Sequence, residues 1–149
     1  MKFTSWILLV LALVVLGALG GVMLSGGQAE PRDLLESALR RFNGPEQDTE
    51  ATLKELELAL RSAEANQDSE LAADILIARG RVLSDVGAFG PARADLERAL
   101  ERYRPGALDI ELELVALDEE TGELDAGLAR ARSITQRDPT QFEAWMRTG

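Results

Sequence analysis

A short pattern occurs twice in this chain, at a distance that strongly limits the folds it can adopt. Residues 76–80 (Leu-x-x-Arg-Gly) and residues 145–149 (Trp-x-x-Thr-Gly) share the same spacing, and the second copy begins 69 residues after the first. That interval equals two steps of 34 or 35 residues, a period typical of stacked helix pairs. Such units bury their apolar faces against their neighbours and usually hold a partner. The period therefore predicts an all-α protein built from antiparallel helical hairpins, in a solenoid.

The composition removes most catalytic and metal-binding chemistry. The chain contains no cysteine and no histidine, so disulfides, thiolate or imidazole metal sites and nucleophiles that depend on these residues cannot form. Carboxylates remain, but a carboxylate-pair hydrolase also needs a deep pocket, which repeat hairpins usually lack. We therefore expect no enzyme activity, no cofactor and no metal ion.

The charge balance points to the kind of partner. The chain carries 26 acidic and 16 basic residues, with a formal net charge of −10. Phosphate backbones and anionic lipid headgroups repel such a domain, so nucleic-acid binding and peripheral lipid docking are not expected. The acidity supports solubility, and it also favours basic partners.

The N-terminal part contains a candidate membrane segment. Residues 6–24 (WILLVLALVVLGALGGVML) form an uncharged apolar run that would be about 28 Å long as a helix, close to the thickness of a bilayer core. We predict a transmembrane anchor over residues 1–25 and a Gly-rich linker over residues 26–31. A cleaved signal peptide remains the alternative, because residues 27–29 (Gly-Gln-Ala) suit a signal peptidase.

The sequence leaves the orientation of the anchor in the membrane undecided, and it offers one candidate face for helix packing. Basic residues flank the apolar run on both sides, so the positive-inside rule favours neither orientation. The short basic start resembles an export signal, and we expect a single-pass inner-membrane protein with its acidic domain on the periplasmic or extracytoplasmic side. Gly17, Gly21 and Ser25 recur every four residues, which suits close helix packing for self-association or for a membrane subunit. The alternative is that glycine is simply common in membrane helices.

The acidic part has helical patterning nearly throughout. Apolar periodicity, capping residues and Gly or Pro stops predict helices over about residues 34–42, 49–65, 69–87, 91–103, 108–119 and 124–137, with a further helix starting after Thr140. No segment alternates with period two, so no strand is expected. We assign a repeat domain to residues 32–149, with units at about 32–66, 69–105 and 107–139 and a partial unit at 140–149.

These pairs resemble the tetratricopeptide repeat, whose signature is W-x2-L-G-x2-Y, then A-x3-F, then Pro. The clearest copy spans residues 76–105, with Leu-x2-Arg-Gly-x2-Leu at 76–83, Ala-x3-Leu at 92–96 and a final Pro105. The copy over residues 114–139 has Val115 in place of the first glycine. Residues 143–149 begin another, and residues 32–66 form a degenerate earlier pair.

The resemblance implies a partner-binding surface lined by the first helix of each pair. Its carboxylates could hold a basic peptide segment, or each residue could belong to a solvated helix face. Arg81 stands among three aspartates and either contacts the partner or neutralises them. The candidates are Asp74, Ile77, Arg81, Ser84 and Asp85 on one helix and Asp109, Leu112, Ala116, Glu119 and Glu120 on the next.

Two functional hypotheses follow. The first is a membrane-anchored scaffold that recruits or assembles other proteins; the second is a small accessory subunit packed into a larger membrane complex. The acidic run at residues 118–125 lacks the spacing of a calcium loop, and Trp145, Tyr103 and Phe89 are expected in the core. Because the last unit is partial, a folded-back cap, a partner and further sequence all remain possible at that edge.

Overall fold

The computed structural model describes residues 29–45 and 47–140, which form six α-helices, one π-helical turn and no strand. This confirms the all-α prediction for that part of the chain. Among the same residues, no helix is both long and apolar enough to span a bilayer. The predicted anchor, its Gly17/Gly21/Ser25 face and the segment 141–149 lie outside the described residues. The elements are α2 (Pro31–Phe42), α3 (Thr49–Ala65), α4 (Ser69–Asp85), α5 (Phe89–Arg98), η1 (Ala99–Tyr103), α6 (Leu108–Glu120) and α7 (Leu124–Arg137).

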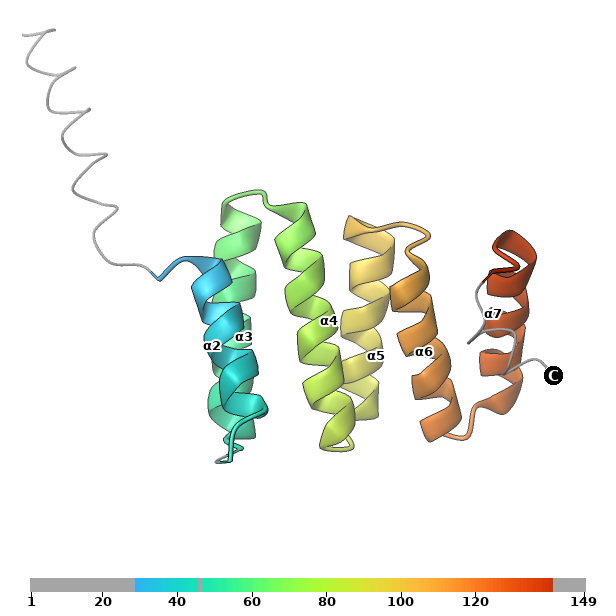
Figure 1. Cartoon of the computed structure of the whole chain (residues 1–149), viewed down its shortest axis with the longest axis horizontal. Helices are drawn as coiled ribbons and strands as arrows, with labels where there is room; N and C mark the ends of the chain where they lie inside the picture. The colour runs from blue at the N-terminus through green and yellow to red at the C-terminus, as the bar shows by residue number, and fades with distance from the viewer. Residues whose placement is uncertain (1–28, 46, 141–149) are drawn as a thin grey trace, which may run out of the picture.

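The helices lie side by side in chain order, and each runs antiparallel to the one before it (Figure 1). The closest neighbours are α2 with α3, α4 with α5, and α6 with α7. In addition, α2 contacts α4, and α5 contacts α6. In Figure 1 the helices α2, α4 and α6 face the viewer, so the first helix of each pair contributes to one common face.

The helix ends lie within three residues of the predicted ones, and one wide turn is added to them. The predicted helix over residues 49–65 matches α3, whereas α5 begins at Phe89, two residues before Pro91. Pro91 still lies in the first turn, where its missing N–H costs nothing. The predicted helix over residues 91–103 ends in η1, because the amide of Arg104 donates to the carbonyl oxygen of Ala99 at 2.9 Å. This one wide turn was not predicted.

Left-handed residues close the tight turns. Gly87 and Gly122 have φ of 74° and 76° and stand 35 residues apart, each two residues after the end of the first helix of a pair. Glycine adopts this conformation without the steric cost that a side chain adds. Gln67, between α3 and α4, takes φ of 58° with a side chain present.

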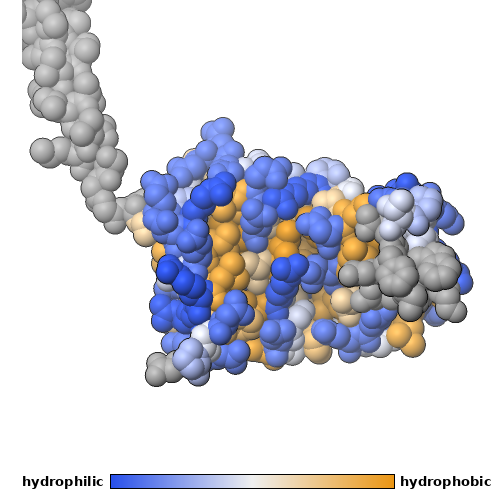
Figure 2. All heavy atoms as spheres, viewed as in Figure 1, coloured by the Kyte–Doolittle hydropathy of each residue, from blue (hydrophilic) through white to orange (hydrophobic). Residues whose placement is uncertain are grey.

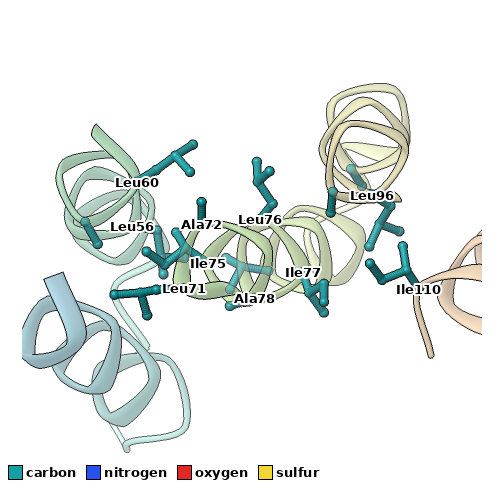
Figure 3. Packing of buried hydrophobic residues seen from close by; sticks show 14 of the residues in the cluster. Leu56, Leu60, Leu71, Ala72, Ile75, Leu76, Ile77, Ala78, Leu96 and Ile110 are labelled. Carbon is teal, nitrogen blue, oxygen red and sulfur yellow. The ribbon is translucent and has the colours of Figure 1, made fainter. Parts of the chain in front are cut away.

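The core is centred on α4, which is buried along most of its length. Figure 3 shows Leu56 and Leu60 of α3 packing on one flank of α4 and Leu96 of α5 and Ile110 of α6 on the other. Full burial of each such side chain contributes about 1.5–3 kcal/mol. The central helix therefore ties the first pair to the rest of the domain.

Glycine permits the two helices of a pair to approach closely in two of the pairs. The glycine lies on the first helix in one pair and on the second helix in the other. A Cβ atom on Gly80 of α4 would lie 3.1 Å from Cγ of Leu96 and 3.4 Å from the carbonyl oxygen of Ala92 on α5. In the next pair the glycine is Gly127 of α7, where a Cβ atom would lie 3.1 Å from Cβ of Asp118 and 3.7 Å from the carbonyl oxygen of Val115 on α6. This contact explains why Val115 can stand where the earlier repeat has a glycine.

An N-cap test follows from the start of α4. The amide of Leu71 donates to the side chain of Asp68 at 3.0 Å, so Asp68→Ala should lower the free energy of unfolding by about 1 kcal/mol. Asp68→Asn keeps a capping oxygen and should lose far less, as measured by urea denaturation followed by circular dichroism. Equal losses in both variants would show that the cap contributes nothing.

Candidate partner-binding groove

An open groove of about 610 Å³ lies on the face shared by α2, α4 and α6. Its apolar side chains recur at helical spacing along α2 and α4, and a band of hydrophobic surface follows the boundary of these two helices in Figure 2. The polar side chains lie around this band. The apolar lining residues are Leu35, Leu39, Phe42, Ile77, Ala78 and Val82, and the polar ones are Asn43, Asp74, Arg81, Asp85 and Asp109.

The structure brings most of the predicted surface residues together. Asp74, Ile77, Arg81, Asp85 and Asp109 all line the groove. A smaller cleft of about 100 Å³ between α4 and α6 continues from it, because both contain Arg81 and Asp85. This cleft also contains the predicted residues Ser84, Ala116 and Glu120.

Two predicted residues lie elsewhere. Leu112 is partly buried against the small core cluster of α6 and α7 that includes Val115 and Ile134. Glu119 is exposed in the last turn of α6 and lines neither the groove nor the cleft. On α6, therefore, only part of the predicted stripe faces the groove.

Of the two roles expected for Arg81, contact with a partner or neutralising the aspartates, the second is not seen among the described residues, because Arg81 pairs with a glutamate. Its guanidinium donates to Glu113 of α6, with Nε 2.8 Å from Oε1. Arg104, and not Arg81, neutralises Asp74. Its guanidinium donates to Asp74 at 2.6 Å and to Glu70 at 2.8 Å. Glu113 stands one helical turn before Ala116, the repeat equivalent of Arg81, and its contact with Arg81 depends on how α4 packs beside α6.

Arg104 also approaches α6, the third helix that lines the groove. Its Nη1 lies 4.0 Å from Oδ2 of Asp109, so one guanidinium joins α4 to α6. Partial burial lowers the pKa of the Arg104 guanidinium, but hydrogen bonds to Asp74 and Glu70 outweigh this and leave that pKa above its ordinary value. The cation is therefore a permanent part of this end of the groove.

The groove wall on α2 was not assigned from the sequence. Apolar periodicity predicts the helix over residues 34–42 that contains Leu35, Leu39 and Phe42, but the 35-residue spacing does not extend to α2. Their place in the groove depends on how α2 packs against α4, which no local signal specifies. The degenerate first pair thus supplies half of the apolar lining.

The first residue of the acidic run at residues 118–125, Asp118, lies in the protein interior. The side chain of Asp118 is fully buried and accepts hydrogen bonds from Arg93 at 2.5 Å and from Arg130 at 3.4 Å. This carboxylate therefore joins α5, α6 and α7. Across residues 29–45 and 47–140, no group of three or more acidic side chains converges on a point that could hold a metal ion.

No protein-family model matches the chain, and no match was found among curated proteins or solved structures. The class that the described residues themselves define is an all-α protein of antiparallel helices, with an open, acidic-rimmed groove on one face.

Proposed function

We propose that this protein is a membrane-anchored scaffold of the tetratricopeptide-repeat kind, which recruits or assembles partner proteins on the face of α2, α4 and α6. The observation that carries the proposal is the open groove of about 610 Å³, which has a largely apolar lining. Leu35, Leu39 and Phe42 of α2 are partly exposed along it, and the buried side chains of Ile77, Ala78 and Val82 of α4 form its floor. Apolar grooves rimmed by polar residues are typical of protein-binding surfaces. Because the groove is open, it suits the binding of a protein segment better than a reaction that needs an enclosed pocket.

The repeat character of the proposal has support at several positions. Gly87 and Gly122 close equivalent turns at a separation of 35 residues. Asp74 with Asp109, and Asp85 with Glu120, recur at the same separation and lie along the same face. A recurring pair of helices that presents equivalent residues on one side is the basis of extended binding surfaces in repeat proteins.

The membrane location rests on the sequence. The uncharged run at residues 6–24 is long enough to cross a bilayer as a helix. A single span there would hold the groove close to the membrane, on the periplasmic or extracytoplasmic side. The scaffold would then gather partners at the membrane surface.

Site-specific photo-crosslinking in intact membranes tests this function. A benzophenone amino acid in place of Asn43, which is exposed and lines the groove, should yield an adduct with a partner protein. The control position is Leu58 on α3, which is 54% exposed and does not line the groove. The scaffold function is wrong if Asn43 yields no adduct, or if both positions give the same adducts.

A second candidate function is that of an accessory subunit in a larger membrane complex. The four-residue spacing of Gly17, Gly21 and Ser25 favours it, since small residues let another helix approach closely. Replacing residues 6–24 by an unrelated transmembrane helix separates the two functions. The Asn43 adduct should persist for a scaffold, and it should disappear for a subunit that is placed by its anchor.

A further inference from the structure

We infer that the groove binds an amphipathic helix of a partner protein, and that an arginine or lysine beside the apolar face of that helix is held by Asp85 and Glu120. This inference rests on the proposed function of the groove as a docking surface. It adds the chemistry of the partner and the position of the cation. The argument starts from two pairs of carboxylates that recur along α4 and α6.

The first pair already holds a cation. Asp74 and Asp109 stand 35 residues apart, in equivalent repeat positions, the first in the second turn of α4 and the other in the first turn of α6. The guanidinium of Arg104 lies between them, 2.6 Å from Asp74 and 4.0 Å from Asp109. The chain itself therefore shows how one arginine joins equivalent carboxylates of neighbouring helices.

The second pair has the same spacing and no such cation. Asp85 and Glu120 are the last residues of α4 and α6, stand 35 residues apart and line one cleft. Within residues 29–45 and 47–140, neither forms an ion pair. Arg81, whose cation lines the same cleft, is paired with Glu113.

The helix ends add to the negative potential at this point. The C-terminal end of a helix carries a partial negative charge, which favours a basic residue in the last turn. Neither α4 nor α6 has one, and both instead end on a carboxylate. A cation from a partner would satisfy both helix ends and both side chains at once.

The apolar lining specifies the rest of the partner. The groove follows α4 from Asp74 to Asp85, about 16 Å at 1.5 Å per residue, between two helices. An amphipathic helix fills such a groove with side chains at i, i+3 or i+4, and i+7. Asp85 lines both the groove and the cleft, so a cation on the edge of that apolar face reaches the second carboxylate pair.

Binding of designed peptides to the full-length protein in a non-ionic detergent tests the inference. The probe is a labelled 18-residue amphipathic helix with leucines on one face and arginines along its edges, and its control carries glutamates at the arginine positions. Fluorescence anisotropy, with the signal of empty micelles subtracted, should show that the glutamate peptide binds at least about tenfold more weakly, because it loses charge-assisted hydrogen bonds.

Charge reversal identifies the carboxylates. Asp85→Lys and Glu120→Lys should each weaken the arginine peptide about tenfold, while their melting temperatures stay equal or rise, since each places a cation at a helix C-terminus. The matched control is Glu101→Lys, an exposed acidic position in η1 outside the groove and the cleft. This combination separates lost binding from lost folding.

The outcomes distinguish this inference from the proposed function. Equal binding of both peptides, or unchanged binding by Asp85→Lys, overturns the basic-helix partner. So does an Asn43 adduct that contains a second copy of the chain, or one formed within a single chain. If Asp85→Lys leaves the Asn43 adduct with another protein intact, the scaffold function stands and only the partner chemistry is wrong. Loss of every Asn43 adduct in the unmodified chain removes the scaffold function itself.

Discussion

Asp118→Ala is expected to lower the free energy of unfolding by about 3 kcal/mol, since removing one partner of a buried ion pair costs about 3–5 kcal/mol. The Asp118 side chain is 0% exposed, and it accepts hydrogen bonds from Arg93 of α5 and Arg130 of α7. Alanine would leave both guanidinium groups without this acceptor and open space beside Gly127. The arginine side chains are 22% and 28% exposed, and Arg93 keeps Glu123 within 3.3 Å, which places the loss at the lower end of the range.

Urea denaturation followed by circular dichroism measures this loss, and Asp125→Ala is the matched control. Asp125 is an exposed acidic residue in the first turn of the neighbouring helix, so its removal should change stability by no more than about 0.5 kcal/mol. A double-mutant cycle with Arg93→Ala isolates the coupling between Arg93 and Asp118. If both aspartate variants unfold alike, the buried pair does not stabilise the fold.

Leu76→Ala is expected to destabilise the protein by about 3–4 kcal/mol, within the range for truncating a buried leucine. Leu76 is 0% exposed on the central helix α4 (Figure 3) and belongs to the core cluster that joins α3, α5 and α6. The loss combines the removed apolar surface with the cavity that its neighbours cannot fill. Because α4 contacts both flanking pairs, the unfolding transition should move as a whole.

Two comparisons make the Leu76 result specific, both by the same denaturation measurement. Leu58→Ala removes the same atoms from a side chain that is 54% exposed, and it should cost less than about 0.5 kcal/mol. Leu76→Met keeps most of the volume and should cost less than about 1.5 kcal/mol. A Leu76→Ala loss no larger than that of Leu58→Ala would contradict the packing described for α4.

Much of the helical framework could be predicted because its signals are local. Asp68 and Gly87 specify the cap of α4 and the turn after it, and α3 occupies the predicted range. The π-helical turn could not be predicted, because no residue in Ala99–Tyr103 marks it. Its partners lie far away in the chain: Tyr103 and Arg98 both donate to Glu64 of α3. The turn occurs together with these tertiary contacts, which the local apolar periodicity does not indicate.

The groove, too, could be predicted where its residues depend on local spacing, and could not be predicted where they depend on tertiary packing. The stripe on α4 was predictable, since Asp74, Ile77, Arg81 and Asp85 share a helix face at fixed spacing. The ion-pair partner of Arg81 and the position of Arg104 could not be predicted. Each depends on how far α4 is shifted along its axis relative to α6. On α6 the repeat equivalence gave both Asp109 and Leu112, but only Asp109 lines the groove, whereas Leu112 packs against the core cluster of the third pair.

The reversed glycines at the two close contacts have a consequence for how such a chain can be recombined. Gly80 faces Ala92, whereas its equivalent Val115 faces Gly127. A chimera that joined the first helix of the third pair to the second helix of the middle pair would bring valine against alanine, with no glycine at the crossing. The opposite exchange would place two glycines there and leave a gap. Viable crossovers therefore fall between pairs, near Pro105 and Gly106, and whole hairpins are the units in which this architecture can be lengthened, shortened or exchanged.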